Sequence, residues 1–290
     1  MRPDLTVLAS RLGGPPVTRY APSPTGYLHL GHVVNAIYVW GLARALQGRV
    51  VVRIEDHDRI RSRTAFEQAL LGDLAWLGFT AESTRFLAVR QSERDQRYRQ
   101  ALRSLRERHH VYACSCSRKD IGAERYPNTC RHLGLEERPD RGLRVEMGTG
   151  EERFVDALLG PQQQSPADDN GDLLLRDRDG HWTYQFAVTV DDIQDGITCV
   201  IRGADLLAST GRQIRLARML GRATPLVFVH HPLIFKPTGE KLSKSAGDTG
   251  VRELRAAGLG AADVIGRAAA AVGLIASPSP VPADTVQDLF

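Results

Sequence analysis

The segment from residue 17 to residue 54 constrains the fold most strongly, because it reads as strand, helix and strand in direct succession. Residues 17–20 form a short β-like run, and the proline- and glycine-bearing loop 21–26 that follows cannot be helical. Apolar side chains recur at helical spacing from about Gly31, and Arg49–Ile54 is a β-branched run typical of a strand buried on both faces. Such a βαβ unit predicts a parallel sheet with a right-handed crossover.

The rest of the chain predicts a second part of the same sheet, separated from the first by an insertion. Helical periodicity covers residues 64–78 and 93–109, and the pattern then becomes irregular between about 111 and 182. A further αβ segment follows, made of residues 183–190 and 197–201, a helix over about 210–220 and a strand over 226–230. Alanine and leucine near the C-terminus predict helix up to about residue 276, and residues 277–284 read as an extended tail.

Composition places the chain among ordinary globular proteins, with 42% hydrophobic and 25% charged residues. No stretch approaches the roughly 20 uninterrupted apolar residues that a membrane helix needs. The first ten residues lack the features of a secretory signal or a transit peptide, so we expect a cytoplasmic protein with no membrane partner. A net charge of +4 permits a polyanionic partner without requiring one.

Lysine is rare and clustered. Of the 38 basic residues only four are lysines, and Lys236, Lys241 and Lys244 fall within nine positions of one another. Where arginine serves almost everywhere, a retained lysine suggests that a compact ammonium on a flexible stem is needed, although chance is the alternative. In a glycine-bearing loop, two such ammonium groups could follow negative charge as it builds on a phosphate.

A second candidate phosphate site is the sequence His29-Leu30-Gly31-His32, which stands where the loop enters the first predicted helix. A helix N-terminus offers unpaired backbone N–H groups and the positive end of the helix dipole. Two imidazoles add donors there, and the glycine allows a nucleotide to lie close to the backbone.

Three of the four cysteines are clustered and predict a metal site. Cys114, Cys116 and Cys130 lie close together in a chain without an export signal, where disulfides are disfavoured. A closed tetrahedral site needs a fourth ligand, and imidazole would ordinarily be favoured over phenol. The candidates within reach in the sequence are His109, His110, Tyr126 and His132.

Several motifs together resemble the class I aminoacyl-tRNA synthetases. The sequence RYAPSPTGYLHLGH at 19–32 and the sequence KLSKS at 241–245 are similar to the paired signatures of that class. The blocks RIEDHD at 53–58, YQFA at 184–187, VDD at 190–192 and VIRGADLL at 200–207 resemble the glutamyl branch. These blocks occur in the family's order, so the resemblance covers most of the chain.

The resemblance implies an α/β fold with a Rossmann-like parallel sheet, a zinc-bearing insertion and a helical C-terminal part. Residues 1–110 would form the first half of the catalytic domain, and 111–182 an insertion that resembles an acceptor-binding domain and carries the zinc. Residues 183–250 would form the second half with the KLSKS loop. Residues 251–290 would form a short helical segment and tail, without an anticodon-binding domain.

The resemblance also implies the roles of individual residues. ATP, with Mg²⁺ on its phosphates, would be bound by His29, Gly31, His32, Lys241, Ser243 and Lys244, of which the two histidines and two lysines would be catalytic. L-Glutamate would be bound by Arg19, Tyr20, Ala21, Pro22, Ser23, Glu55, Tyr184 and Arg202. These residue types fit a dianionic amino acid, because arginines can grip carboxylates and a glutamate can hold the α-ammonium group.

For the metal site, the resemblance favours tyrosine as the fourth ligand. The spacing of Cys114, Cys116, Tyr126 and Cys130 resembles the Cys-x-Cys and Tyr-x3-Cys zinc pattern of short paralogues of glutamyl-tRNA synthetase. With four protein ligands and no redox role, one zinc ion would be structural. The remaining cysteine, Cys199, is expected to be a buried structural thiol where the family often has histidine.

The length of the chain indicates which molecule accepts the glutamyl group. A full-length glutamyl-tRNA synthetase would continue from KLSKS into an anticodon-binding domain, whereas 45 residues follow Ser245 here. We therefore expect a truncated paralogue, a monomer that transfers glutamate to the queuosine base at the wobble position of tRNA(Asp). The alternatives are a glutamate-activating fragment with another acceptor, a fragment of a synthetase for tRNA(Glu), and a noncatalytic zinc-containing RNA-binding paralogue.

Arg59-Ile60-Arg61 replaces the prolines that often follow RIEDxD in such paralogues, which leaves the RNA contacts of that loop open.

Overall fold

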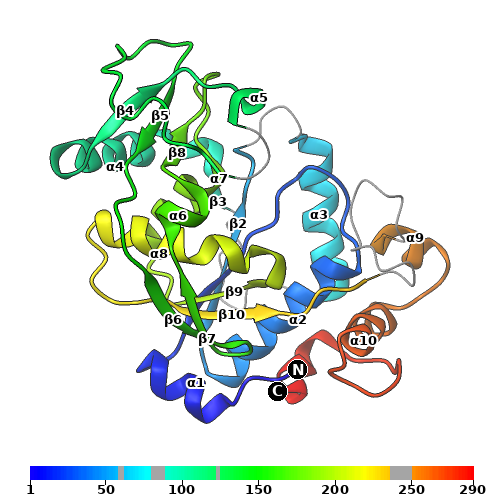
Figure 1. The fold of residues 1–290 in the computed structure, drawn as a ribbon. Helices are drawn as coiled ribbons and strands as arrows, with labels where there is room; N and C mark the ends of the chain where they lie inside the picture. The colour runs from blue at the N-terminus through cyan, green and yellow to red at the C-terminus, as the bar shows by residue number, and fades with distance from the viewer. Residues whose placement is uncertain (58–61, 80–88, 122–124, 236–249) are drawn as a thin grey trace.

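The computed structural model describes residues 1–57, 62–79, 89–121, 125–235 and 250–290. At its centre two groups of strands meet edge to edge (Figure 1). One group has the order β1 (Val17–Tyr20), β2 (Arg49–Ile54), β3 (Val89–Arg90), and the other has the order β7 (Gly160–Gln164), β6 (Glu152–Asp156), β10 (Val227–His231), β9 (Cys199–Gly203). The Thr198 amide beside β9 donates to the Val17 carbonyl oxygen of β1 at 2.9 Å, which joins the two groups.

The predicted βαβ unit is confirmed. Strands β1 and β2 pair in parallel from Val17 opposite Arg49 to Tyr20 opposite Val52. The connecting helix α2 (Leu30–Ala45) is buried along most of its length, because strands and the C-terminal segments both pack against it. The prediction that β2 is buried on both faces holds only for its carboxyl-terminal half, since its first three residues are exposed or half-buried.

The helices predicted from periodicity form with nearly the expected bounds. They are α3 (Thr64–Leu77), α4 (Asp95–Arg108) and α8 (Thr210–Met219), and residues 183–190 begin α7 (Tyr184–Gln194). One further helix, α1 (Leu5–Leu12), was not predicted; the Asp4 carboxylate caps it by accepting the amides of Thr6 and Val7.

The expectation of irregular structure between residues 111 and 182 is wrong. Strands β4 (Val111–Cys114), β5 (Gly142–Val145) and β8 (Leu173–Arg176) form an antiparallel sheet, accompanied by the short helices α5 (Arg118–Ile121) and α6 (Pro166–Asn170). The hairpin β6–β7 from the same range pairs instead with β10, where Asp156 lies opposite Phe228. These strands are four or five residues long, and apart from the local β6–β7 hairpin they form by pairing between segments distant in the chain.

The C-terminal part is helical, but its helices end earlier than predicted. They are α9 (Val251–Ala256) and α10 (Ala261–Ala271). The chain after residue 277 returns to the core, where the 3₁₀ segment η4 (Ala283–Leu289) packs on α2. A Cβ on Gly41 of α2 would meet the Phe290 ring at 2.3 Å, so this contact requires glycine. The two chain termini lie close together (Figure 1).

No helix in the described part of the chain is both long enough and apolar enough to cross a lipid bilayer.

Candidate active site

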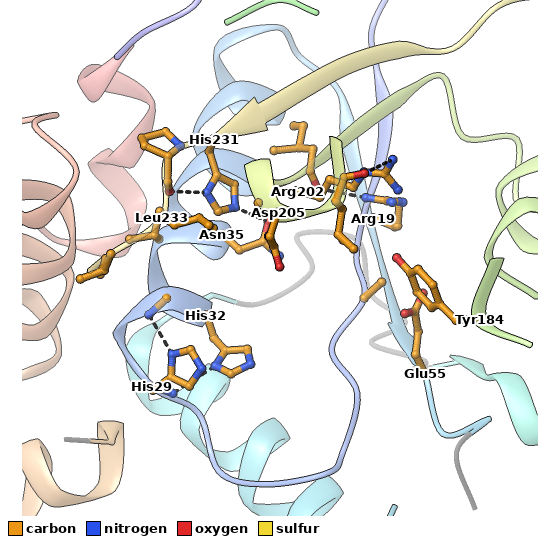
Figure 2. A pocket seen from close by; sticks show the side chains of 18 residues that line it. Arg19, His29, His32, Asn35, Glu55, Tyr184, Arg202, Asp205, His231 and Leu233 are labelled. Carbon is orange, nitrogen blue, oxygen red and sulfur yellow. Dashed lines mark hydrogen bonds between the residues drawn. The ribbon is translucent and has the colours of Figure 1, made fainter. Parts of the chain in front are cut away.

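The candidate active site lies at the carboxyl ends of the central strands. From β1 the sheet continues to β2 on one side, and from β9 it continues to β10 on the other, so a crevice opens between β1 and β9. A cavity of about 410 Å³ occupies this region, and Figure 2 shows the side chains around it. Eight of the predicted site residues line the cavity: Arg19, Ala21, His29, Gly31, His32, Glu55, Tyr184 and Arg202.

Three other predicted residues lie behind this lining. The Tyr20 hydroxyl donates to the His32 carbonyl oxygen at 3.3 Å, and the Pro22 carbonyl oxygen accepts the Glu55 amide at 3.0 Å. These two residues therefore position cavity residues, while Ser23 belongs to the same loop without lining the cavity. The predicted loop residues Lys241, Ser243 and Lys244 lie outside the described residues.

His29 and His32 cap the start of α2. The Gly31 amide donates to His29 Nδ1, and the His29 amide donates to His32 Nδ1, both at 3.1 Å. A ring nitrogen that accepts a backbone N–H carries no proton, so each neutral imidazole has its proton on Nε2. The two rings, 4.0 Å apart, stand at the N-terminus of a 16-residue helix, whose dipole favours an anion. This end of the cavity suits phosphate.

Glu55 supplies a buried carboxylate at the opposite end of the cavity. Its Oε1 lies 3.1 Å from Nη2 of Arg53, and burial raises the pKa of Glu55 while Arg53 opposes this rise. Asp192 lies between Arg53 and Arg19, at 2.9 and 3.2 Å. Burial alone would raise the pKa of Asp192, but these two guanidinium groups lower it below its usual value. Because Asp192 pairs with both guanidinium groups, the Glu55 carboxylate can also accept a cationic group from a ligand, such as an ammonium.

A buried ionic network holds the helix that carries Tyr184. Arg94, just before α4, pairs with Asp191 at 2.7 Å and with Asp195 at 2.8 Å. Arg53 of β2, which is fully buried, reaches the same acidic cluster on α7. Tyr184 is the first residue of α7, so the network fixes the position of its ring at the cavity wall. Burial, and then the nearby Glu55, raise the pKa of Tyr184.

Arg202 of β9 is a buried cation held by neutral groups. Its Nε donates to His230 Nε2 at 3.0 Å, Nη1 to Gln213 Oε1 at 2.7 Å, and Nη2 to Thr210 Oγ1 at 2.8 Å. Its side chain lines the cavity, yet within the described ranges it forms no ion pair with a carboxylate. Burial lowers the pKa of this guanidinium below its usual value. A buried charge without a counter-ion is costly, so the site favours an anionic ligand.

Sequence reasoning missed the residues that orient Arg202. His230 Nδ1 lies 2.7 Å from Asp156 Oδ2, which places the proton on Nδ1 and leaves Nε2 to accept from Arg202. His230 ends the predicted strand 226–230, and ligands bind at the carboxyl ends of such strands, so its position was a usable signal. Asp156 comes from the hairpin β6–β7, and nothing in its sequence neighbourhood marked it as a site residue.

Asn35 and His231, whose side chains lie 3.3 Å apart, form another part of the cavity wall.

The three clustered cysteines meet in a separate centre beside β4. The Sγ atoms of Cys114, Cys116 and Cys130 all lie within 4.8 Å of one another. The Tyr126 hydroxyl lies 3.4 Å from Cys114 Sγ and accepts the Cys130 amide at 3.0 Å. Among the alternatives, His109 Nε2 contacts the Met219 carbonyl oxygen and His110 Nδ1 contacts Glu146. The arrangement favours Tyr126 over these imidazoles.

The donor set of this centre fits zinc. Three thiols with a phenol oxygen supply four donors, and the Arg144 Nε donates to Cys114 Sγ at 3.3 Å. Burial opposes ionisation of Cys130, but hydrogen bonds from the Ser115 backbone and from neighbouring side chains lower its pKa to about 7. The thiolate is the form that binds metal. Cys199 lies apart and is buried, as predicted.

Replacing Cys116 with alanine is expected to abolish retention of one zinc ion and to lower the thermal unfolding midpoint, because a structural zinc contributes folding free energy. Tyr126→Phe should weaken zinc retention against a chelator, whereas His132→Ala should not. Zinc content and thermal unfolding measure both effects, and Cys199→Ala is the control that should keep its zinc. Full zinc content in Cys116→Ala, or zinc loss in His132→Ala alone, would contradict the assigned ligands.

Comparisons with known proteins agree with this arrangement. Residues 16–263 match the family described as tRNA synthetases class I (E and Q), catalytic domain. The chain is 39% identical to a glutamyl-Q tRNA(Asp) synthetase of Symbiobacterium thermophilum, covering 94% of this chain and 91% of the relative. It is 43% identical to one of Burkholderia cenocepacia, with 80% of each chain covered.

A solved structure of a glutamate tRNA ligase from Elizabethkingia meningosepticum, in complex with its amino acid, has a similar fold. The two chains are 28% identical with a TM-score of 0.70, and the match covers 81% of this chain. The match covers 53% of the ligase, so this chain spans about half of that protein's length.

Proposed function

The chain belongs to the catalytic-domain family of class I glutamyl- and glutaminyl-tRNA synthetases and, within it, to the glutamyl-Q tRNA(Asp) synthetases. From this membership we propose that it activates L-glutamate with ATP and transfers the glutamyl group to the queuosine base at the wobble position of tRNA(Asp). Activation would proceed without tRNA.

The observation that carries the proposal is the buried cation Arg202. Its guanidinium lines the cavity and is held by His230, Gln213 and Thr210, all neutral partners. Arg19, by contrast, pairs with Asp192. A substrate carboxylate would supply the counter-ion that Arg202 lacks, while Glu55 would bind the α-ammonium group. This pair of charges matches glutamate, whose side chain is anionic, better than an uncharged amino acid.

In the first step, an oxygen of the glutamate α-carboxylate attacks the α-phosphorus of ATP, the bond to the bridging oxygen breaks, and pyrophosphate leaves. His29 and His32 at the N-terminus of α2 would donate Nε2–H hydrogen bonds to the phosphates. Lys241 and Lys244, with Ser243 beside them, would stabilise the charge that builds on the leaving group. Holding both reactants in one cavity makes their orientation the main source of rate acceleration.

In the second step, a hydroxyl of the queuosine cyclopentene ring attacks the carbonyl carbon of the glutamyl adenylate. The new ester C–O bond forms, the C–O bond to the phosphate breaks, and AMP leaves. The hydroxyl proton ends on the departing phosphate or on water. No further oxidant or reductant is required.

The remaining parts of the proposal concern the metal ions, the cellular location, the oligomeric state and the domain division. Mg²⁺ would accompany ATP, and one structural zinc ion would be held by Cys114, Cys116, Tyr126 and Cys130. The protein would act in the cytoplasm as a monomer. The chain would divide into the catalytic halves 1–110 and 183–250, the insertion 111–182 and the C-terminal segment 251–290, although the hairpin β6–β7 pairs with the second half.

We expect glutamate-dependent pyrophosphate exchange in the absence of any tRNA, followed by transfer of labelled glutamate to queuosine-containing tRNA(Asp). The same tRNA(Asp) without queuosine should remain unlabelled, because it lacks the attacking hydroxyl. Glutamine in place of glutamate is the matched control for the charge of Arg202 and should support little exchange. Equal labelling of both tRNA forms would refute the modified-base acceptor while leaving glutamate activation standing.

A further inference from the structure

A second pocket has a lining that includes His57. Its volume is about 390 Å³, and we call it the Trp182 pocket after its largest aromatic wall. His57 follows Glu55 by two residues, and its ring centroid lies 5.8 Å from that of Tyr184. Glu55 and Tyr184 both line the first cavity, so His57 stands between the two spaces.

The walls of the Trp182 pocket combine aromatic rings with carboxylates. The Trp182 and Tyr98 rings lie 5.9 Å apart, and the Trp182 Nε1–H donates to Asp95 Oδ1 at 2.8 Å, which orients the indole. Asp179 and His181 come from the turn after β8, which Asp177 caps by accepting both of their backbone amides. The Asp179 side chain is exposed and accepts no hydrogen bond from the described residues.

This chemistry selects a particular kind of occupant. The half-buried Trp182 ring favours a stacked base, and the exposed Asp179 carboxylate would attract a cation. Queuosine combines these features, because its cyclopentene ring is joined to a deazaguanine by a secondary amine that is protonated at neutral pH. An unmodified guanine carries no such charge.

A helix face with three exposed arginines leads away from the same pocket. Arg99 lines the pocket, and Arg103 and Arg106 follow it at spacings of four and three residues on the exposed face of α4. Arg99 pairs with Asp95 and Arg106 pairs with Glu137, and these surface pairs can exchange their carboxylate for a phosphate. The opposite face of α4 packs on the β4–β5–β8 sheet through Tyr98, Leu102 and Leu105. The three arginines span roughly 10 Å along the helix, a spacing that suits successive phosphates of an RNA strand.

We propose that the Trp182 pocket receives the queuosine base of the acceptor RNA, with the base stacked on Trp182 and its secondary ammonium paired with Asp179. The inference rests on the proposed function and extends it to the residues that distinguish the modified base. The backbone on either side of the base would follow the arginine face of α4. From this pocket the cyclopentene hydroxyls would pass His57 toward the glutamyl carboxyl group.

The test compares Asp179→Asn with the wild type in transfer of labelled glutamate to queuosine-containing tRNA(Asp). We expect KM for this RNA to rise about tenfold, as for loss of one charge-assisted contact. Glutamate-dependent pyrophosphate exchange should stay within about twofold, because Asp179 does not line the first cavity. Asp179→Glu should restore most of the transfer. Asp284→Asn, which removes an exposed carboxylate in η4, is the matched control and should behave as wild type.

A binding measurement separates recognition of the ammonium from general RNA contact. Asp179→Asn should bind tRNA(Asp) without queuosine as tightly as the wild type does. Wild-type KM in Asp179→Asn, or equal weakening with both tRNA forms, would overturn the pocket assignment and leave the proposed function intact. A wild-type protein that exchanges pyrophosphate but labels neither tRNA form would instead overturn the proposed acceptor, and with it the role of the pocket.

Discussion

Replacing Arg202 with glutamine is expected to lower kcat/KM for glutamate in pyrophosphate exchange by about 100-fold or more. The guanidinium is buried, lines the cavity and has no carboxylate partner within the described structure, so the substrate carboxylate would be its counter-ion. Loss of one partner from a buried charge pair costs about 2–5 kcal/mol. The main effect should be on KM, because the interaction is present in both the bound substrate and the transition state.

A stability measurement distinguishes lost binding from lost folding. Glutamate at 100 times its Kd should stabilise the wild type by about 2.7 kcal/mol, through binding to the folded state alone. In Arg202→Gln this shift should fall to about 0.4 kcal/mol or less at the same concentration, while the unfolding midpoint without glutamate changes much less. Arg153→Gln removes an exposed guanidinium and is the matched control. A glutamate-induced shift of wild-type size in Arg202→Gln would refute the role of this residue.

Replacing His32 with asparagine is expected to lower the rate of pyrophosphate exchange by about 10²- to 10³-fold, as for loss of one donor to a developing negative charge. The asparagine Oδ1 can take the place of Nδ1 and still accept the His29 amide, so the helix cap is preserved. The variant lacks any group at the position of Nε2. The loss should therefore appear in kcat with little change in thermal stability.

His32→Gln is the complementary variant. Its longer amide can place a donor near the position of Nε2, and its Oε1 can accept the His29 amide as glutamine does at this position of a capping box. We therefore expect partial activity with stability close to that of the wild type. Exchange kinetics and thermal unfolding of both variants measure the two roles separately. If the asparagine variant retained wild-type kcat, the histidine would only cap the helix.

Local patterns were sufficient to predict the elements formed within one stretch of chain. The βαβ unit of 17–54 was predicted because its apolar spacing changes period where strand gives way to helix. The same logic found α3, α4 and α8. The strands of residues 111–182 were not predicted, because they are short and most of them depend on pairing with a segment far along the chain, while β7 pairs with β6 in a local hairpin.

In the candidate site too, local features were predictable from the sequence and features that join distant segments were not. The histidines at the start of α2 were evident because a helix N-terminus binds anions wherever it occurs. The chain of hydrogen bonds from Asp156 through His230 to Arg202 was not, since its members lie on β6, β10 and β9. The Trp182 pocket likewise joins α4 to the turn after β8.

The sequence by itself determined the kinds of chemistry available to this protein. Its motifs supplied imidazoles at a helix start, arginines and a glutamate at strand ends, and three cysteines for a metal, because these signals depend on neighbours along the chain. Only the tertiary structure decided which charges neutralise one another. Arg19 and Arg53 both meet Asp192, which leaves Arg202 among neutral partners. Such pairing depends on how strands and helices pack, and packing brings together residues that are far apart in the chain.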